Sequence, residues 1–187
     1  MSDSIWASTL EAFRDRVASR EPVPAGVTVA AVSATLALAL LSKVLQVTRN
    51  HKDFAGDRDL IAELLADTRH TYQTLSRLAD DDVTAFREFM ASSKHPDASA
   101  GERTDAIRSA IHVPLEVART SSFGIALCEK ARGHIHAVVA PDLGIAAGLL
   151  AGAVRSTLVT VTANLEHLPE SDPFRIDAAK EASRLSI

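Results

Sequence analysis

The sequence predicts an all-α fold, a bundle of about five to six helices with two long central helices rich in alanine and glycine. Apolar residues make up 47% of the chain and aromatic residues only 4%, which favours an aliphatic core of closely packed helices. Apolar positions recur at steps of three and four, and no segment has a strong strand pattern. With 187 residues the chain is long enough for one core, so we predict a single domain over residues 1–187.

The first central helix is predicted from residues 22–42, PVPAGVTVAAVSATLALALLS, which carry no charge. Its prolines and Gly26 form a turn at the front, and the helix should end near residue 48. A stretch of about twenty uncharged residues would also span a membrane. Half of this stretch, however, is Ala, Gly, Ser or Thr, which contribute little to insertion. We therefore predict a helix buried inside the protein and no membrane association.

The other helices follow from apolar periodicity and from the breaks in it. Pro114 should kink or restart the helix that contains it. Residues 135–140 are the only candidate strand, and they are too isolated to form a sheet. We expect helices at residues 4–19, 57–89, 102–131, 141–165 and 174–186, and a loop at residues 92–101.

Small residues mark one face on each of the two central helices. On the second helix, glycines four residues apart lie along one side, where another backbone could approach closely: Gly144, Gly148 and Gly152. The first helix has a comparable face formed by alanines: Ala30, Ala34 and Ala37. We expect these two faces to pack against each other near the middle of the domain.

The totals exclude several classes of protein. The 20 basic and 24 acidic residues give a net charge of −4 without a basic stripe, which argues against nucleic-acid binding. The single cysteine, Cys128, excludes an internal disulfide, suits a reducing compartment and should lie in the core. Residues 1–6 lack the basic start and apolar run of a secretory signal. We expect a cytoplasmic protein.

Two aspartates are the first candidates for chemistry. Asp82 falls within the apolar stripe of its helix, so helical geometry directs its carboxylate inward or to the edge of the stripe. A half-buried carboxylate can act as a general base; the alternative is a solvated rim residue in the acidic run 80–82. Asp142 is the only formally charged residue between Arg132 and Arg155. It is either a site residue or the N-cap of the following helix.

Three further groups could bind a ligand. Gly26 and Thr28 lie where the first central helix begins, and free backbone N–H groups there favour an anion, although an ordinary turn is the alternative. Residues 49–52 contain Arg49, His51 and Lys52, which form either a basic site or a solvated helix C-cap. In the connector 134–136 the two histidines, His134 and His136, have weak metal-ligand spacing and no third ligand nearby. We expect no metal.

Five short strings resemble motifs of the methenyltetrahydrofolate cyclohydrolase and formiminotetrahydrofolate cyclodeaminase family, in the same order. Residues 22–31, PVPAGVTVAA, resemble its opening PTPGGGSVAA, and residues 82–86, DVTAF, resemble D-x-x-A-F. Residues 113–115 match V-P-L, and residues 142–146, DLGIA, are similar to the end of S-D-x-G-V-A. Asn164 stands at the second Asn of N-V-x-x-N. The strings are distributed over the whole chain.

The resemblance implies an all-helical domain that forms a homodimer and acts on a one-carbon tetrahydrofolate derivative. In the cyclohydrolase reaction, water adds to the carbon that bridges two folate nitrogens; in the cyclodeaminase reaction, an internal nitrogen attacks a formimino carbon and ammonia leaves. The folate is the substrate, and no separate cofactor is implied. By position, Asp82 and Asp142 would be the acid/base and orienting carboxylates. The remaining positions would bind the substrate: Gly26 and Thr28 as a loop, Lys52 with Arg49 as a basic anchor, and Asn164 as a polar contact.

The sequence departs from the family pattern where the ligand should lie. Ala25 and Val27 replace two of the three loop glycines, and residues 50–54 read NHKDF where the family has G-K-K-x-Y. Pro141 replaces the Ser before the second Asp, and Thr160 replaces the first Asn of N-V-x-x-N.

Three hypotheses about function follow from these similarities and departures. The first is a folate cyclohydrolase or cyclodeaminase. The second is an enzyme on the same scaffold that performs a cyclisation or C–N bond step on a non-folate substrate, which the altered connector with His134 and His136 would favour. The third is a non-catalytic helical dimer with a binding or regulatory role.

Overall fold

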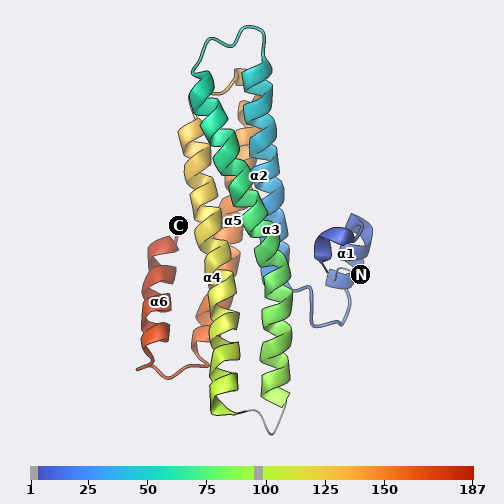
Figure 1. Cartoon of the computed structure of the whole chain (residues 1–187), viewed down its shortest axis with the longest axis vertical. Helices are drawn as coiled ribbons and strands as arrows, with labels where there is room; N and C mark the ends of the chain where they lie inside the picture. Colours follow the sequence, from blue (N-terminus) through green and yellow to red (C-terminus); the bar gives the residue numbers. More distant parts are fainter. Residues whose placement is uncertain (1–3, 95–98) are drawn as a thin grey trace.

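The computed structural model describes residues 4–94 and 99–187, and every regular element in this part of the chain is helical. This confirms the all-α prediction. Four long helices form the bundle, and shorter ones flank it (Figure 1). The elements are η1 (Ile5–Ala7), α1 (Leu10–Val17), α2 (Gly26–Asn50), α3 (Arg58–Lys94), α4 (Ala100–Ala131), η2 (Ala137–Val139), α5 (Ala140–Leu165) and α6 (Pro173–Leu185).

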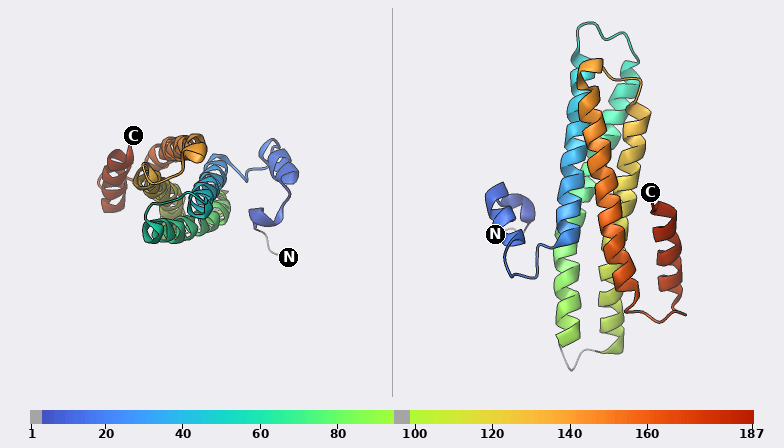
Figure 2. Two further views of the ribbon diagram at one scale, coloured as in Figure 1. Left: turned by 90° about the horizontal axis from the view of Figure 1, so that it is seen from above. Right: turned by 180° about the vertical axis from the view of Figure 1, so that it is seen from behind.

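Helices α2 to α5 alternate in direction along one long axis (Figures 1 and 2). Helix α2 packs against α3 and α5, and α4 packs against the same two helices from the other side. The core between them is aliphatic, as the composition predicts. Its largest fully buried side chains come from all four helices: Leu38, Leu41, Leu45, Ile61, Leu64, Leu75, Ile111 and Leu150.

The N-terminal segment differs from the continuous helix expected at residues 4–19. Ser8 has an extended backbone, and Thr9 starts α1 as an N-cap that accepts a hydrogen bond from the N–H of Ala12. A Thr at this position favours a new helix start over continuation. Helix α1 buries no residue, and Leu10 is 77% exposed, so this helix lies beside the bundle (Figure 2). Amphipathic spacing predicted the helix but not a partner for its apolar side.

Short contacts fix the N-terminal segment to α3. Ile5 is buried in the core, and its backbone N–H donates to the carboxylate of Asp80 at 2.9 Å. The indole N–H of Trp6 donates to the carbonyl of Ser76 at 2.9 Å. These bonds hold the chain in place just before α1, which is followed by the turn that leads to α2. The Val23–Pro24 peptide in that turn is cis.

The loop predicted at residues 92–101 is shorter in the structure. Helix α3 continues to Lys94, and α4 begins at Ala100 after Ser99, which forms a capping box with Glu102. Residues 95–98 of the predicted loop lie outside the described residues, as do residues 1–3 of the segment tested for a signal. The connector at 135–140 contains the 3₁₀ turn η2 and no strand.

The glycine face of α5 is not packed as predicted. Helices α2 and α5 do contact each other, and the predicted alanine face of α2 is buried. A Cβ atom added at Gly144, Gly148 or Gly152, however, would meet nothing within 4 Å. The inward side of α5 is instead formed by Ala146 and Leu150, which are fully buried. The glycines therefore lie on the outer surface of the bundle.

Among the described residues, two helical segments are long and apolar enough to cross a membrane by length and composition. In α2 the apolar window is 61% buried, as expected for a core helix. In the segment Ala137–Leu165, which includes α5, only 33% of the window is buried. The exposed side of α5 is therefore more apolar than the solvent-facing side of a helix usually is. That the chain has no membrane association stays a prediction.

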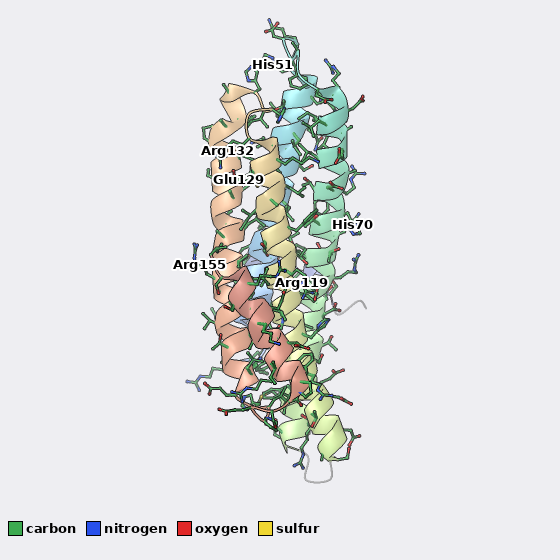
Figure 3. All side chains as sticks on the ribbon, turned by 90° about the vertical axis from the view of Figure 1, so that its left-hand side faces the viewer. His51, His70, Arg119, Glu129, Arg132 and Arg155 are labelled. Carbon is green, nitrogen blue, oxygen red and sulfur yellow. The ribbon has the colours of Figure 1, made fainter. Side chains whose placement is uncertain are left out.

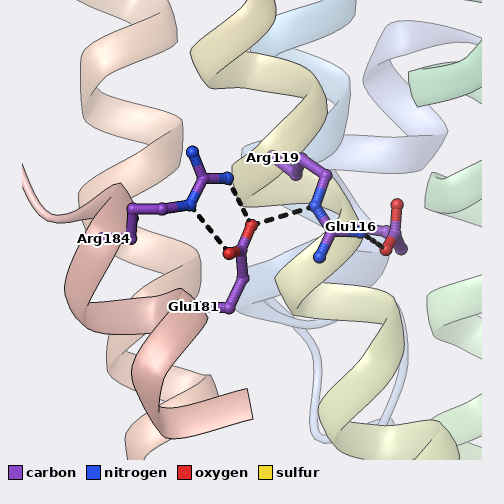
Figure 4. A network of polar contacts seen from close by, with 4 residues as sticks. All are labelled: Glu116, Arg119, Glu181 and Arg184. Carbon is purple, nitrogen blue, oxygen red and sulfur yellow. Dashed lines mark hydrogen bonds and ion pairs between the residues drawn. The ribbon is translucent and has the colours of Figure 1, made fainter. Parts of the chain in front are cut away.

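A network of charged side chains attaches α6 to α4 (Figure 4). Glu181 of α6 accepts hydrogen bonds from the Nε of Arg119 at 3.1 Å and from Arg184 at 2.7 and 2.9 Å. Arg119 also pairs with Glu116 on its own helix. These hydrogen bonds lower the pKa of the Glu181 carboxyl to about 2.

We expect acid to loosen α6. Because the folded pKa of Glu181 lies below the ordinary value of 4.5, its stabilising contribution is complete above that value and is lost as the pH falls through about 2. Amide protection factors in α6, corrected for intrinsic exchange, should therefore fall with acidification more than those of α2. In Glu181→Gln the α6 amides should start less protected and depend less on pH. An unchanged acid response in that variant would show that other carboxylates hold α6.

Candidate functional site

A cavity of about 170 Å³ lies between the start of α2 and the three other long helices. Among the described residues that line it, Asp82 is the only ionisable one, and the others are small, aliphatic, aromatic or neutral polar. The lining residues are Ala25, Gly26, Val27, Asp82, Ala85, Phe86, Phe89, Ala110, Thr160 and Asn164. Three segments that resemble family motifs, those at residues 25–27, 82–86 and 164, thus meet in one place.

Asp82 is buried, with 8% of its surface exposed. The hydroxyl of Thr28 donates to its Oδ2 at 2.6 Å. Burial raises the pKa of the Asp82 carboxyl, while hydrogen bonds from the side chain and backbone of Thr28 lower it, and burial is the larger effect. A carboxyl whose pKa burial raises holds its proton more readily than an ordinary carboxyl, and in a small cavity it can accept and donate a proton, which is the chemistry of a general acid or base.

The same carboxylate caps α2. The N-cap residue Ala25 has no side chain that could accept from the first N–H groups of the helix. Asp82, which lies on α3, acts as the cap instead, because its carboxylate accepts hydrogen bonds from the backbone and the hydroxyl of Thr28. The start of α2 was predicted to favour an anion, and in the structure it meets the carboxylate of the protein's own Asp82. Of the two predicted loop residues, Thr28 is buried against Asp82 and Gly26 is exposed at the cavity wall.

Asn164 has a structural contact that the sequence did not reveal. Helix α4 continues through Pro114 without the expected restart, and Pro114 has no N–H to donate to the carbonyl of Ala110. The side-chain amide of Asn164 donates to that carbonyl at 2.7 Å. Asn164 thus satisfies a buried acceptor that the proline leaves free. Both Ala110 and Asn164 line the cavity, so this bond also shapes its wall.

The altered loop keeps ordinary backbone geometry. Ala25 has φ −121° and Val27 lies in the first turn of α2, and among the described residues only Gly133 has a positive φ. No position in this loop therefore requires glycine for its conformation. The two replacements act through their side chains, because both residues line the cavity and narrow it.

Asp142 lies far from this cavity within one chain. It is in the first turn of α5, where Val139 is the N-cap, and its Oδ2 accepts from the Nζ of Lys43 at 3.0 Å. At 1.5 Å per residue, Asp142 is roughly 33 Å along α5 from Asn164. The two predicted carboxylates do not meet inside one subunit.

The predicted basic residues also lie at the far end of the bundle, where His51 is seen at the top of Figure 3. The rings of His51 and His136 stack with centroids 3.8 Å apart, and the backbone N–H of His136 donates to the hydroxyl of Thr48 at 3.0 Å. His134 and Lys52 are exposed nearby. These residues join the α2–α3 loop to the α4–α5 connector, about 30 Å from Asp82 by helix length.

Sequence reasoning missed the aromatic wall of the cavity. Phe86 and Phe89 stand four and seven residues after Asp82, so they lie on the same face of α3. That spacing could have indicated them as neighbours of the carboxylate. Within residues 4–94 and 99–187, no group of three His, Cys, Asp or Glu side chains is placed to hold a metal ion.

Comparison with known proteins places this geometry in a family. The model of the formiminotransferase-cyclodeaminase family matches residues 9–183. The methenyltetrahydrofolate cyclohydrolase of Methylorubrum extorquens is 29% identical over 169 residues, which cover 87% of this chain and 81% of that protein. The formimidoyltransferase-cyclodeaminase of Rattus norvegicus is 30% identical over 193 residues, 98% of this chain but only 34% of the rat protein.

A solved structure agrees in fold over nearly the whole chain. The formiminotetrahydrofolate cyclodeaminase of Thermotoga maritima superposes with a TM-score of 0.90 at 27% identity, covering 97% of this chain and 90% of that one. The family match, the shared architecture and the cavity formed by the motif segments agree. The chain belongs to the formiminotransferase-cyclodeaminase family.

Proposed function

We propose that the protein opens or closes a C–N bond on a one-carbon tetrahydrofolate derivative, as a methenyltetrahydrofolate cyclohydrolase or a formiminotetrahydrofolate cyclodeaminase. The observation that carries this proposal is Asp82, a buried carboxyl with a raised pKa in a cavity where three motif segments meet. Relatives with each of the two activities match most of the chain. The alternatives of a non-folate substrate or a non-catalytic dimer are not favoured by these relatives.

Asp82 would manage the proton in either reaction. In the cyclohydrolase, water forms a C–O bond to the bridging carbon and one C–N bond breaks. Asp82 accepts a proton from the water and gives it to the departing nitrogen, and the second proton is released as the formyl carbonyl forms. In the cyclodeaminase, an internal N–H nitrogen forms a C–N bond to the carbon of the protonated formimino group and loses one proton. Asp82 can transfer that proton to the terminal NH2, whose C–N bond breaks as ammonia leaves.

Absorbance of methenyltetrahydrofolate tests this function directly. Its loss on adding the purified protein should exceed the loss in buffer alone, where the compound hydrolyses unaided. Formiminotetrahydrofolate with ammonia detection forms the second arm. Faster loss of methenyltetrahydrofolate alone indicates a cyclohydrolase, and faster release of ammonia from formiminotetrahydrofolate alone indicates a cyclodeaminase. No acceleration in either arm by folded protein would refute the folate assignment and favour a different substrate.

We propose further that the chain works as a homodimer, as the family resemblance implies. The cavity of about 170 Å³ is smaller than the roughly 300 Å³ at which ligand pockets usually begin. One chain can therefore enclose only the reacting part of a folate. The outer side of α2 and α5 offers a surface for a second copy, because exposed Leu36, Ile145 and Leu149 surround the bare glycines of α5.

We name this surface the glycine face, and we expect it to pack on the same surface of a second copy because it combines a hollow with exposed apolar side chains. A hollow of about 260 Å³ runs along it, lined by Gly26 and Ser33 of α2 and by Gly148, Gly152 and Ser156 of α5. A leucine from a second copy fits such a hollow. If the α5 helices cross antiparallel at Leu149, the partner subunit's Asp142 lies level with Ser156, seven residues on the other side. In such a crossing the second predicted carboxylate would lie near Gly26, the residue shared by the hollow and the Asp82 cavity.

Gly148→Leu should abolish dimerisation without unfolding the chain. An added Cβ at Gly148 meets nothing within 4 Å, and replacing a mid-helix glycine stabilises a helix by about 1 kcal/mol, so the subunit should remain folded. Sedimentation velocity should change from a dimer to a monomer of 19.9 kDa. Ala62→Leu, an exposed position on α3, is the matched control and should stay dimeric. A monomeric wild type, or a dimeric Gly148→Leu, would exclude this interface.

A further inference from the structure

A second, larger hollow lies on the other side of α2, away from the glycine face. It measures about 400 Å³ and runs between α2 and α3. Its lining is mainly polar: Ser42, Gln46, Arg49, Leu65, Ala66, Arg69, His70 and Gln73. His70 is seen on the outer side of α3 in Figure 3. Arg69 is roughly 20 Å along α3 from Asp82, so this hollow is separate from the candidate active site.

Helical spacing aligns these side chains along one groove. On α2, Ser42, Gln46 and Arg49 are four and seven residues apart and therefore share a face. On α3, Arg69 and Gln73 are four apart and share the facing side. Because α2 and α3 pack along their length, the two rows lie opposite each other.

The charge in this hollow is uncompensated. Two arginines and a histidine line it, and none of the described residues that line it is acidic. The chain has 24 acidic residues, and many of its other arginines use them: Arg108, Arg119, Arg132 and Arg184 all form ion pairs. Among the described residues, no carboxylate pairs with the guanidinium of Arg49 or Arg69. Two unpaired guanidinium groups therefore converge on one hollow of a protein whose net charge is −4.

The neutral lining residues add hydrogen-bond donors. The amide nitrogen of Gln46 donates to the hydroxyl of Ser42 at 3.1 Å, which leaves the Ser42 proton free for an acceptor. Gln73 contributes a second amide. Guanidinium groups bind carboxylates and phosphates with two parallel hydrogen bonds, and these amide and hydroxyl donors suit the remaining oxygens of such a ligand.

We propose that this hollow binds a small, multiply charged anion that carries carboxylate or phosphate groups. Arg49 and Arg69 bind two of the anionic groups from opposite helices, and His70, Gln46 and Gln73 complete the donor set. The site is independent of the folate reaction. A bound anion would connect the C-terminal part of α2 to the N-terminal half of α3.

Isothermal titration with citrate and with pyrophosphate, in the absence of any folate, tests the site. At low ionic strength one of the two should bind with a stoichiometry of one per chain. Arg69→Gln should weaken that binding about tenfold or more, because a hydrogen-bonded ion pair is lost. Arg77→Gln removes the same charge from an exposed position of α3 outside the hollow and should leave the affinity within about twofold.

The outcomes separate the sources of the anion and can overturn the proposal. Preference for citrate indicates a polycarboxylate ligand, and preference for pyrophosphate indicates a phosphorylated one. Equal weakening in Arg69→Gln and Arg77→Gln would reduce the effect to diffuse attraction and refute a defined site. No binding of either anion by folded wild-type protein would also refute it.

Discussion

Asp82→Asn should lower the catalysed rate by a factor of about 10² to 10⁴, the range that general acid–base groups contribute, without lowering thermal stability. The asparagine keeps an oxygen that can accept from the hydroxyl of Thr28, so the contact that anchors the start of α2 survives. It cannot take up or release a proton. Initial rates of methenyltetrahydrofolate hydrolysis, corrected for buffer, and a thermal unfolding curve measure the two effects.

Asp81→Asn is the matched control. Asp81 is the adjacent residue and is exposed, so it lies outside the cavity although it carries the same charge. Its replacement should leave the rate nearly unchanged. A fully active Asp82→Asn would remove Asp82 from the chemistry and leave it the role of a helix cap. Equal losses in both variants would indicate a general effect of acidic charge on α3.

The direction of the Asp82 pKa shift predicts how the Asp82→Asn change affects stability at different pH values. Burial raises the folded pKa of Asp82 above its ordinary value of 3.8, so ionisation of this carboxyl destabilises the fold. That cost is absent below 3.8 and is complete once the pH exceeds the folded pKa. At neutral pH, Asp82→Asn should therefore melt at the same temperature or higher. In the wild type, the midpoint of the acid limb of the pH–rate profile should lie at a higher pH than the pKa of an ordinary carboxyl. In Asp82→Asn this limb should disappear.

The sequence predicted the long helices well because they are long. The apolar face of α2 and of α3 repeats over many turns, so a single residue that breaks the pattern does not change the predicted helix. The same reasoning made Asp82 a candidate, because helical geometry directs a carboxylate within an apolar stripe inward or to the edge of the stripe. The structure shows that it is buried. It failed for the short segment at residues 4–19, where Thr9 caps a new helix and α1 buries nothing. Periodicity says which side of a helix is apolar but not what covers it.

The rest of the site depends on contacts between distant segments. Nothing local to Asn164 shows that its amide serves the carbonyl that Pro114 leaves free on another helix. Similarly, Gly148 has the spacing of a packed face, yet the packed side of α5 is the one with Leu150. Asp142 matches a family motif in sequence but lies near the start of α5, whereas Asn164 of the Asp82 cavity lies near its end. Motifs give the residues of a site, while the fold and the proposed partner decide which of them meet.

Leu38→Ala should destabilise the protein by about 2–5 kcal/mol, the range for a fully buried leucine. Leu38 has no exposed surface and lies where α2, α4 and α5 meet. Urea unfolding at one fixed protein concentration measures the loss, since a dimer would make stability depend on concentration. Leu10→Ala, at a side chain that is 77% exposed, should change the free energy of unfolding by less than about 0.5 kcal/mol.

Gly124 explains why Leu38 fits so tightly and gives a second test of the same packing. A Cβ added at Gly124 would lie 3.1 Å from Leu38 and 3.0 Å from Leu150, closer than side chains normally pack. In the wild type, Gly124→Ala should therefore offset its gain in helix propensity of about 1 kcal/mol by crowding. In the Leu38→Ala background the contact with Leu38 is gone while the contact with Leu150 at 3.0 Å remains, so Gly124→Ala should cost less stability there than in the wild type. Additive effects of the two changes would show that this contact does not set the spacing of α2 and α4.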